Sequence, residues 1–210
     1  MTSTQTIFIP LFIAATALFV WSCWKRLSLT ALGKADDRLE DIGQRVGDTL
    51  RYAFAQVRVL QKPYGIVHLA IFWCFLVLMA ANAEFILHGL FPAISFAKLP
   101  DGISMPLMQI IDVVSLITLL AVTAAAIRRL VSPPYPEART FEAFFILFLI
   151  ATLMLANFGV NAAKISRLQG ENLNLFHRVL PISSFFAAFV PSGAGKLVHD
   201  LSWWTHALVL

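Results

Sequence analysis

The chain has 210 residues, of which 59% are hydrophobic and only 13% are charged, and its formal net charge is +4. A mean hydropathy of +0.76 excludes a water-soluble domain, because such a chain has too little polar surface for its length. The composition therefore predicts an integral membrane protein, with lipid around it and no nucleic-acid partner.

Apolar runs of sufficient length predict the transmembrane helices. A hydrocarbon core about 30 Å thick needs roughly 17–25 apolar residues in one helix. Four runs have this length: Ile7–Trp24, Tyr64–Leu87, Met105–Ile127 and Phe141–Val160. A fifth run begins near Leu197 and is still apolar at Leu210, so we expect the sequence to be cut inside a helix. The expected fold is one membrane domain over residues 1–210, an all-α transmembrane bundle of about five helices.

The segment between the first two runs predicts an amphipathic helix in the cytoplasm. Its apolar residues recur at spacings of three and four. They are Leu39, Ile42, Val46, Leu50, Phe54, Val57 and Leu60. Asp36 and Asp37 stand at its start, where the helix dipole favours acidic groups. We expect its arginines to face anionic headgroups of the inner leaflet, and a docking surface for an electron-transfer domain is the alternative.

Basic residues predict the orientation in the membrane. No charged residue precedes Lys25, whereas the connection Lys25–Lys62 carries eight Lys and Arg residues. The connection after the third run carries Arg128, Arg129 and Arg139. Because cytoplasmic loops are enriched in Lys and Arg, both connections are expected in the cytoplasm. The N-terminus is then outside, and the protein is expected in the cell inner (cytoplasmic) membrane.

Two loop segments have their own patterns. The sequence "SPPYPE" at Ser132–Glu137 predicts a stiff turn that ends the third helix, because proline cannot continue a helix. In the external loop Asn161–Lys196, the segment Leu180–Val190 is apolar but too short to span. We expect this segment to be re-entrant or interfacial.

His68 lies about one turn inside the second helix, where a run of apolar residues follows it. A buried imidazole is costly unless its ring nitrogens are bonded. Gly65, Phe72, Phe75 and Met79 share its helix face, so a small residue lies beside the imidazole and apolar residues lie beyond it. This pattern fits an axial haem ligand with an apolar wall for the macrocycle. It fits equally well a histidine that is hydrogen-bonded to a carbonyl of a neighbouring helix.

Two further histidines are candidate ligands of haem iron. His206 enters the fifth run from the outer side and is expected inside the membrane, whereas His199 is expected at the headgroups beside Trp203. His88 ends the second helix. Twenty residues separate it from His68, so it points about 200° away around the helix and is a secondary candidate.

Polar residues within the spans gather in the outer half of the membrane: Glu84, Gln109, Asp112 and Asn157. A quinol oxidised near that face must release protons, and a carboxylate in a low dielectric readily accepts one. Glu84 and Asp112 are the candidates for this role, with hydrogen bonds between helices as the alternative. Gln109 and Asn157 are expected to make only such hydrogen bonds. Lys164 and Arg167 are expected to pair with haem propionates or with lipid phosphates.

Four stretches carry a family resemblance. They are "FAQVRVLQKPYGIVHLAIFWCFLVL", the "RRL" after the third helix, "LANFGVNAAKI" and "LSWWTHALVL". Together they resemble the N-terminal membrane domain of heterodisulfide-reductase-related, membrane-bound iron–sulfur oxidoreductases, which are linked to electron-transfer flavoprotein and quinone. That membrane domain is similar to the nitrate reductase gamma subunit, a quinol-oxidising cytochrome b. The resemblance covers nearly the whole chain and implies a nitrate reductase gamma-like fold.

The resemblance implies one or two b-type haems and iron–sulfur clusters in a cytoplasmic domain after Leu210. His68 and His206 match histidine positions of the family, whereas the gamma subunit's further ligand on the second helix corresponds here to Leu78. His68 is expected near the inner face and His206 near the outer face. We therefore expect a histidine beyond Leu210 to complete the haem at His68, and His206 to ligate an outer haem or to line a quinone pocket.

The predicted function is membrane electron transfer between the quinone pool, menaquinone or ubiquinone, and cytoplasmic iron–sulfur or flavoprotein centres through haem b. The protein would be part of a quinone-linked oxidoreductase. The alternative is a haem-free membrane anchor of a redox complex, whose buried histidines and carboxylates bond only to protein. A transporter is a third hypothesis, but the spans lack the paired broken helices found at transporter sites.

Overall fold

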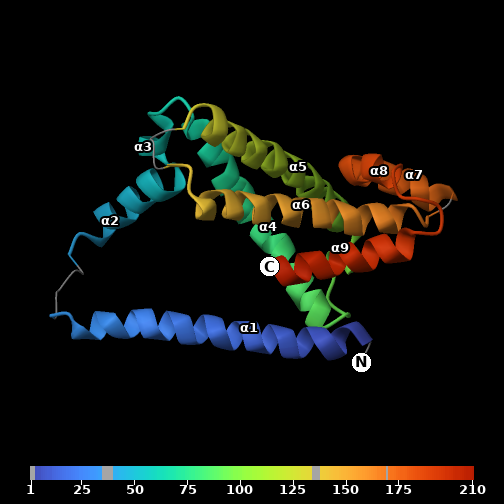
Figure 1. Ribbon diagram of the computed structural model, residues 1–210, viewed down its shortest axis with the longest axis horizontal. Helices are drawn as coiled ribbons and strands as arrows, with labels where there is room; N and C mark the ends of the chain where they lie inside the picture. The colour runs from blue at the N-terminus through green and yellow to red at the C-terminus, as the bar shows by residue number, and fades with distance from the viewer. Residues whose placement is uncertain (1–2, 35–39, 134–137, 169) are drawn as a thin grey trace.

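The computed structural model describes residues 3–34, 40–133, 138–168 and 170–210, and every regular element in these ranges is a helix (Figure 1). Four of its helices are long and apolar enough to cross a membrane. They are α1 (Ser3–Leu27), α4 (Gly65–Leu90), α5 (Asp101–Val131) and α6 (Phe141–Ile165). Each matches one of the four long apolar runs to within a few residues. The prediction of an all-helical chain is therefore confirmed for the part that the structure describes, and these four helices have the length and composition that crossing a membrane requires.

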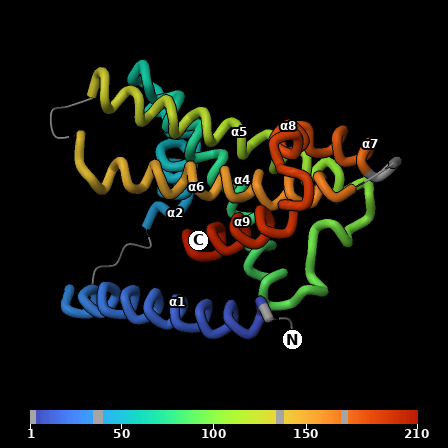
Figure 2. Tube along the Cα trace, turned by 45° about the vertical axis from the view of Figure 1, so that its right-hand side comes forward, coloured from blue at the N-terminus to red at the C-terminus, as the bar shows by residue number. Residues whose placement is uncertain are grey.

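The bundle consists of α4, α5, α6 and the shorter α9 (Gly195–Val209), which corresponds to the fifth apolar run. α9 lies along α6, and α5 packs against both α4 and α6 (Figures 1 and 2). α6 and α9 approach closely at Gly159, where a Cβ atom would overlap the Ser202 side chain. Small residues allow membrane helices to approach closely, so Gly159 sets the spacing of this pair.

Helix α1 meets the bundle near its own start and diverges from it towards Leu27 (Figures 1 and 2). Phe8 is buried against α4, where a Cβ atom on Gly89 would lie 2.5 Å from its ring. The Gln5 side chain donates a hydrogen bond of 3.2 Å to the Leu90 carbonyl. The large side chains further along α1 are exposed, as expected for a helix surrounded by lipid.

The prediction of one continuous amphipathic helix between α1 and α4 is wrong. The structure divides it into α2 (Ile42–Asp48), a π-helical turn η2 (Thr49–Phe54) and α3 (Val57–Leu60). Gln56 has a left-handed φ of 49°, and a side-chain-bearing residue in this conformation ends a right-handed helix. The break lets Phe54 pack edge-on against Phe72 of α4, with 6.3 Å between ring centroids. The predicted helix start at Asp36 and Asp37 lies outside the described residues.

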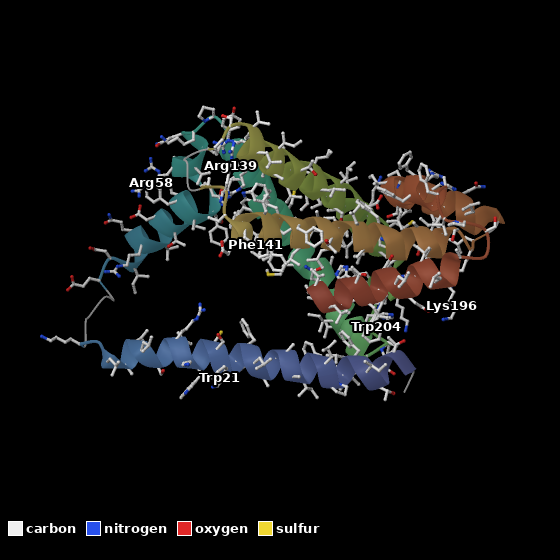
Figure 3. The ribbon with its side chains drawn as sticks, in the orientation of Figure 1. Trp21, Arg58, Arg139, Phe141, Lys196 and Trp204 are labelled. Atoms are coloured by element: carbon white, nitrogen blue, oxygen red, sulfur yellow. The ribbon has the colours of Figure 1, made fainter. Side chains whose placement is uncertain are left out.

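Figure 3 shows which labelled basic side chains lie at each end of the bundle. Arg58 and Arg139 lie at the end where α4 and α6 begin, and Lys196 lies at the opposite end, where α9 begins. α5 ends at Val131, as predicted from the proline-rich turn, although most of that turn lies outside the described residues. Arg139 donates to the Arg129 carbonyl at 3.0 Å and thereby joins the end of α5 to the chain before α6.

Two short helices follow α6 before the chain enters α9. They are α7 (Gly170–Val179) and α8 (Pro181–Ala187). α8 falls within the segment that was expected not to span, and its seven residues are indeed too few to cross a membrane. It packs against α5 and α6, and its Ser183 and Ser184 are buried. The short 3₁₀ helices η1 (Ser28–Leu32) and η3 (Phe96–Lys98) complete the described elements.

Candidate functional site

A partly enclosed polar cavity lies between α4, α5, α6 and α9, in the half of the bundle where α4 and α6 end. All four helices and the chain after α4 supply polar lining residues: Asn82, Glu84 and His88 on α4, Ser95 before η3, Ser115 on α5, Asn157, Asn161 and Lys164 on α6, and His206 on α9. The α6 residues recur at spacings of four and three, which places them on one helix face. The cavity volume is about 160 Å³, similar to the roughly 150 Å³ cavity that holds one benzene ring.

His206 forms one wall of this cavity and is only 5% exposed. Its Nε2 atom lies 3.3 Å from Asn82 Oδ1, and its ring stacks on Phe85 with 4.3 Å between centroids. Because an amide oxygen can only accept, Nε2 carries the proton and Nδ1 is left as an acceptor. A metal ion at Nε2 would have to displace Asn82.

Glu84 supplies the one carboxylate in the lining of the cavity among the described residues. Its Oε1 atom accepts a hydrogen bond of 3.0 Å from the Phe96 backbone N–H, which orients the group. Lys164 lines the same cavity, although much of its side chain is exposed. The site thus brings a carboxylate and an amine to one cavity in an otherwise largely apolar bundle. A carboxylate among membrane helices is costly and marks a functional site by default.

Asp112, the other predicted proton acceptor, does not line the cavity. Its side chain is fully buried and caps the start of α8. The Ile182 N–H donates to Oδ2 at 2.8 Å, and the Ser183 hydroxyl donates to Oδ1 at 2.5 Å. Capping of this kind satisfies the free N–H groups at a helix start. The geometry of Asp112 therefore fits the structural alternative of a hydrogen bond between elements.

His68 lies near the opposite end of α4, sixteen residues or about 24 Å along the helix from Glu84. Its side chain is exposed, contrary to the expected burial, and no hydrogen bond or ion pair links it to another described residue. Asn82, the partner of His206, is about 21 Å from His68 along the same helix. The two candidate histidines therefore lie too far apart to ligate one haem.

Gly65 has a different role from the expected one of making room for a cofactor. A Cβ atom at this position would overlap the Val59 carbonyl oxygen. The space beside Gly65 is thus filled by the backbone of α3, and glycine is required for the tight turn from α3 into α4. Of the apolar residues expected on the helix face of His68, Phe75 and Met79 are exposed and Phe72 is partly covered.

Lys164 and Arg167 lie near the end of α6, far from His68. Arg167 is exposed and its Nε atom donates to the Ala163 carbonyl at 2.9 Å. Gln109 is exposed on α5 and makes no hydrogen bond within the described residues, so the expected contact between helices is wrong. Asn157 makes the expected hydrogen bond between helices, because its side-chain amide donates to the Ser115 hydroxyl on α5 at 3.2 Å.

His88 lies at the outer rim of the cavity. Its Nδ1 atom is 2.9 Å from the Ile94 carbonyl, so it is engaged by the chain that follows α4. The described residues contain no cluster of three or more metal-ligating side chains at His88 or elsewhere.

Sequence reasoning missed Asn82 and Phe85, which hold His206 in place. The available signal was a lone amide inside an apolar run, since such a group needs a partner within the membrane. Ser183 was also missed, because a serine in a loop has no periodic pattern that would relate it to Asp112.

Comparison with known proteins relates the chain to oxidoreductases. It is similar to the EtfAB:quinone oxidoreductase of Syntrophomonas wolfei subsp. wolfei, with 27% identity over 92% of this chain and 28% of that protein. It is also similar to the probable iron-sulfur-binding oxidoreductase FadF of Bacillus subtilis, with 29% identity over 95% of this chain and 29% of that protein. The chain thus spans less than a third of the length of either relative. No family model and no solved structure matches it.

Proposed function

We propose that the chain is the membrane part of an oxidoreductase that transfers electrons between a quinone, menaquinone or ubiquinone, and cytoplasmic iron–sulfur or flavoprotein centres. The polar cavity between α4, α5, α6 and α9 carries this proposal, because it places a carboxylate, a lysine and a buried histidine around a space for one ring. The names of the two relatives support it, since one is a quinone oxidoreductase and the other an iron–sulfur-binding oxidoreductase.

The lining of the cavity suits a quinone headgroup. The two quinone oxygens need hydrogen-bond donors, and Lys164 and the Asn161 amide can supply them. Quinol oxidation also requires a group that accepts protons, which is the role of Glu84. Phe85 and Trp203 add flat apolar walls, and the volume matches the quinone ring itself. The second ring of a naphthoquinone and the tail would extend through the open side of this partly enclosed cavity. His206 contributes the acceptor atom Nδ1 while Asn82 holds its ring.

Haem b is the cofactor that the resemblance implies, and His68 is the residue that fits it. An imidazole without a partner on a membrane helix is unfavourable, and binding to iron would satisfy one ring nitrogen. His68 would supply one axial ligand, and the second would come from elsewhere in the assembled protein. When bound, the haem would carry single electrons between the quinone and the cytoplasmic iron–sulfur or flavoprotein centres.

The alternative of a haem-free membrane anchor is favoured by one observation. Asp112 and His206, the two most deeply buried titratable residues, both bond to protein groups. An anchor would need only such contacts. The two hypotheses differ in the absorption spectrum and in the reaction with quinol.

The test uses the full-length protein that contains this chain, purified in detergent. We expect a reducible b-type absorption spectrum, and we expect a short-chain naphthoquinol to reduce the protein's redox centres. His68→Ala should lose the haem spectrum, while the matched variant His177→Ala on the exposed part of α7 should keep it. Glu84→Gln should slow reduction by quinol at least tenfold and leave reduction by dithionite unchanged. A well-folded protein with no haem spectrum and no reaction with quinol would favour the anchor.

A further inference from the structure

A second pocket adjoins the polar cavity on the outer side of the bundle. It has a volume of about 550 Å³, is more open than the cavity, and lies between the start of α1, the end of α4 and the start of α9. Its charged and titratable lining consists of His88, Lys196, His199 and Asp200. Two residues line both spaces, His88 and Trp203. These two side chains therefore form the boundary between the cavity and the outer pocket.

Trp203 is a fixed part of this boundary. Its ring lies 5.4 Å from Phe8, 5.2 Å from Phe85 and 4.9 Å from Trp204, measured between centroids. It thus joins α1, α4 and α9 and has no group that titrates. Of the two side chains at the boundary, only His88 can therefore carry a proton.

The hydrogen bonding of His88 prepares it for this role. Nδ1 lies 2.9 Å from the Ile94 carbonyl oxygen, which can only accept, so Nδ1 carries the proton in the neutral ring. The lone pair of the imidazole is then on Nε2. An imidazole with one protonated and one free nitrogen can accept a proton at one atom and release it again.

Glu84 lies one helical turn before His88, on the same face of α4. Side chains four residues apart on a helix are neighbours, with about 5–6 Å between their Cβ atoms. Glu84 lines the cavity but not the outer pocket, whereas His88 lines both. Oε1 of Glu84 is held by the Phe96 N–H, which leaves Oε2 as the second oxygen. The order from the inside outwards is therefore cavity, Glu84, His88 and outer pocket.

We propose that His88 carries protons between the quinone cavity and the outer pocket. The proposal rests on the proposed function of the cavity. When a quinol is oxidised there, its two electrons pass singly to the one-electron centres of the full-length protein. Its two O–H bonds break and its two C–O bonds become C=O. Each proton moves to the Glu84 carboxylate, then to Nε2 of His88, and then to water in the outer pocket. When a quinone is reduced instead, protons follow the same route inwards, and the quinone takes up two protons together with two electrons.

Charged groups lie on both sides of His88. On the cavity side they are Glu84 and Lys164. Lys98, which follows α4, lines neither space and donates to the Pro92 carbonyl at 3.1 Å. In the outer pocket, Lys196 and Asp200 form an ion pair of 2.6 Å, and Nδ1 of His199 lies 3.3 Å from Asp200. A second imidazole beside a carboxylate is thus available to receive a proton from His88 through water.

The experiment measures single-turnover reduction of the redox centres in the full-length protein by a short-chain naphthoquinol. His88→Asn keeps an amide that can donate to the Ile94 carbonyl but removes the basic nitrogen, and we expect at least a tenfold slower reaction. His88→Ala should be equally slow and should recover with added imidazole, which fits the open outer pocket. Pyrazole, a ring of the same size and a much weaker base, should not restore the rate. Dithionite should reduce every variant at the same rate.

His177→Ala is the matched control, because this histidine is exposed on α7 and lines neither space. Thermal unfolding must show that each variant is folded. If both His88 variants react like the wild type, the route through His88 is wrong while the quinone site stands. If folded His88→Ala is slow and imidazole does not restore it, His88 has a structural role only, which also overturns the proposal. If quinol fails to reduce the wild type, the proposed function is wrong and the proton route falls with it.

Discussion

His206 on α9 and Asn82 on α4 share a hydrogen bond of 3.3 Å, although 124 residues separate them in the chain. This contact, together with the stacking of His206 on Phe85, fixes the position of α9 relative to α4. It also forms one wall of the polar cavity. The buried imidazole of His206 therefore has a partner, whereas the imidazole of His68 has none within the described residues.

The first prediction concerns this pair. Asn82→Leu leaves the Nε2–H of His206 buried without an acceptor, and we expect a loss of about 1–3 kcal/mol in the free energy of unfolding. The double variant Asn82→Leu/His206→Phe removes both polar groups, so most of the loss should be recovered. Thermal unfolding in detergent measures both. A double variant as unstable as the sum of the two single variants would show that the hydrogen bond is not what holds this contact.

The second prediction separates the two candidate carboxylates. Asp112→Ala leaves the Ile182 and Ser183 N–H groups at the start of α8 unpaired, and should destabilise the protein by about 1–3 kcal/mol. Asp112→Asn keeps one acceptor oxygen and should cost less. Because Asp112 does not line the cavity, Asp112→Asn should keep the rate of reduction by naphthoquinol within twofold, unlike Glu84→Gln. If a folded Asp112→Asn variant lost this reaction, Asp112 would be a proton acceptor after all.

The third prediction tests the contact between α6 and α9. A methyl group in Gly159→Ala would overlap Ser202, and overpacking of this kind costs about 1–3 kcal/mol. Adding Ser202→Gly removes the overlapping atoms and should restore much of the stability. Gly102→Ala is the control, because a Cβ atom there meets nothing within 4 Å. Equal melting temperatures for Gly159→Ala and Gly102→Ala would mean that the two helices do not approach as described.

The fourth prediction concerns orientation in the membrane. In a background with Cys23 and Cys74 replaced, Ser192→Cys should react with a membrane-impermeant thiol reagent in intact cells. Gly43→Cys should react only after the cells are opened. The reason is the excess of basic residues on the side of α2 and α3, which favours the cytoplasm. Both sites suit the experiment, because Ser192 is exposed and the space around Gly43 is open. The opposite labelling pattern would reverse the predicted topology.

The positions of the long helices could be predicted from the sequence. The run Phe141–Val160 lies within α6, Met105–Ile127 lies within α5, and Tyr64–Leu87 matches α4 to within a few residues. The physical reason is that a helix in lipid must satisfy its own backbone hydrogen bonds and present apolar side chains along about 20 residues. Both conditions depend on local composition, so a single stretch of sequence is enough to meet them.

The identity of the site was decided by tertiary structure. Glu84 and Asp112 are both carboxylates within apolar runs, and the sequence offers no reason to treat them differently. The rotation of each helix about its axis turns Glu84 towards the cavity and Asp112 towards α8, and that rotation is set by packing against other helices. The left-handed turn at Gln56 and the contact of Gly65 with Val59 likewise depend on where α3 meets α4. Hydropathy determines which segments enter the membrane, whereas the faces that meet there follow from contacts between residues far apart in the chain.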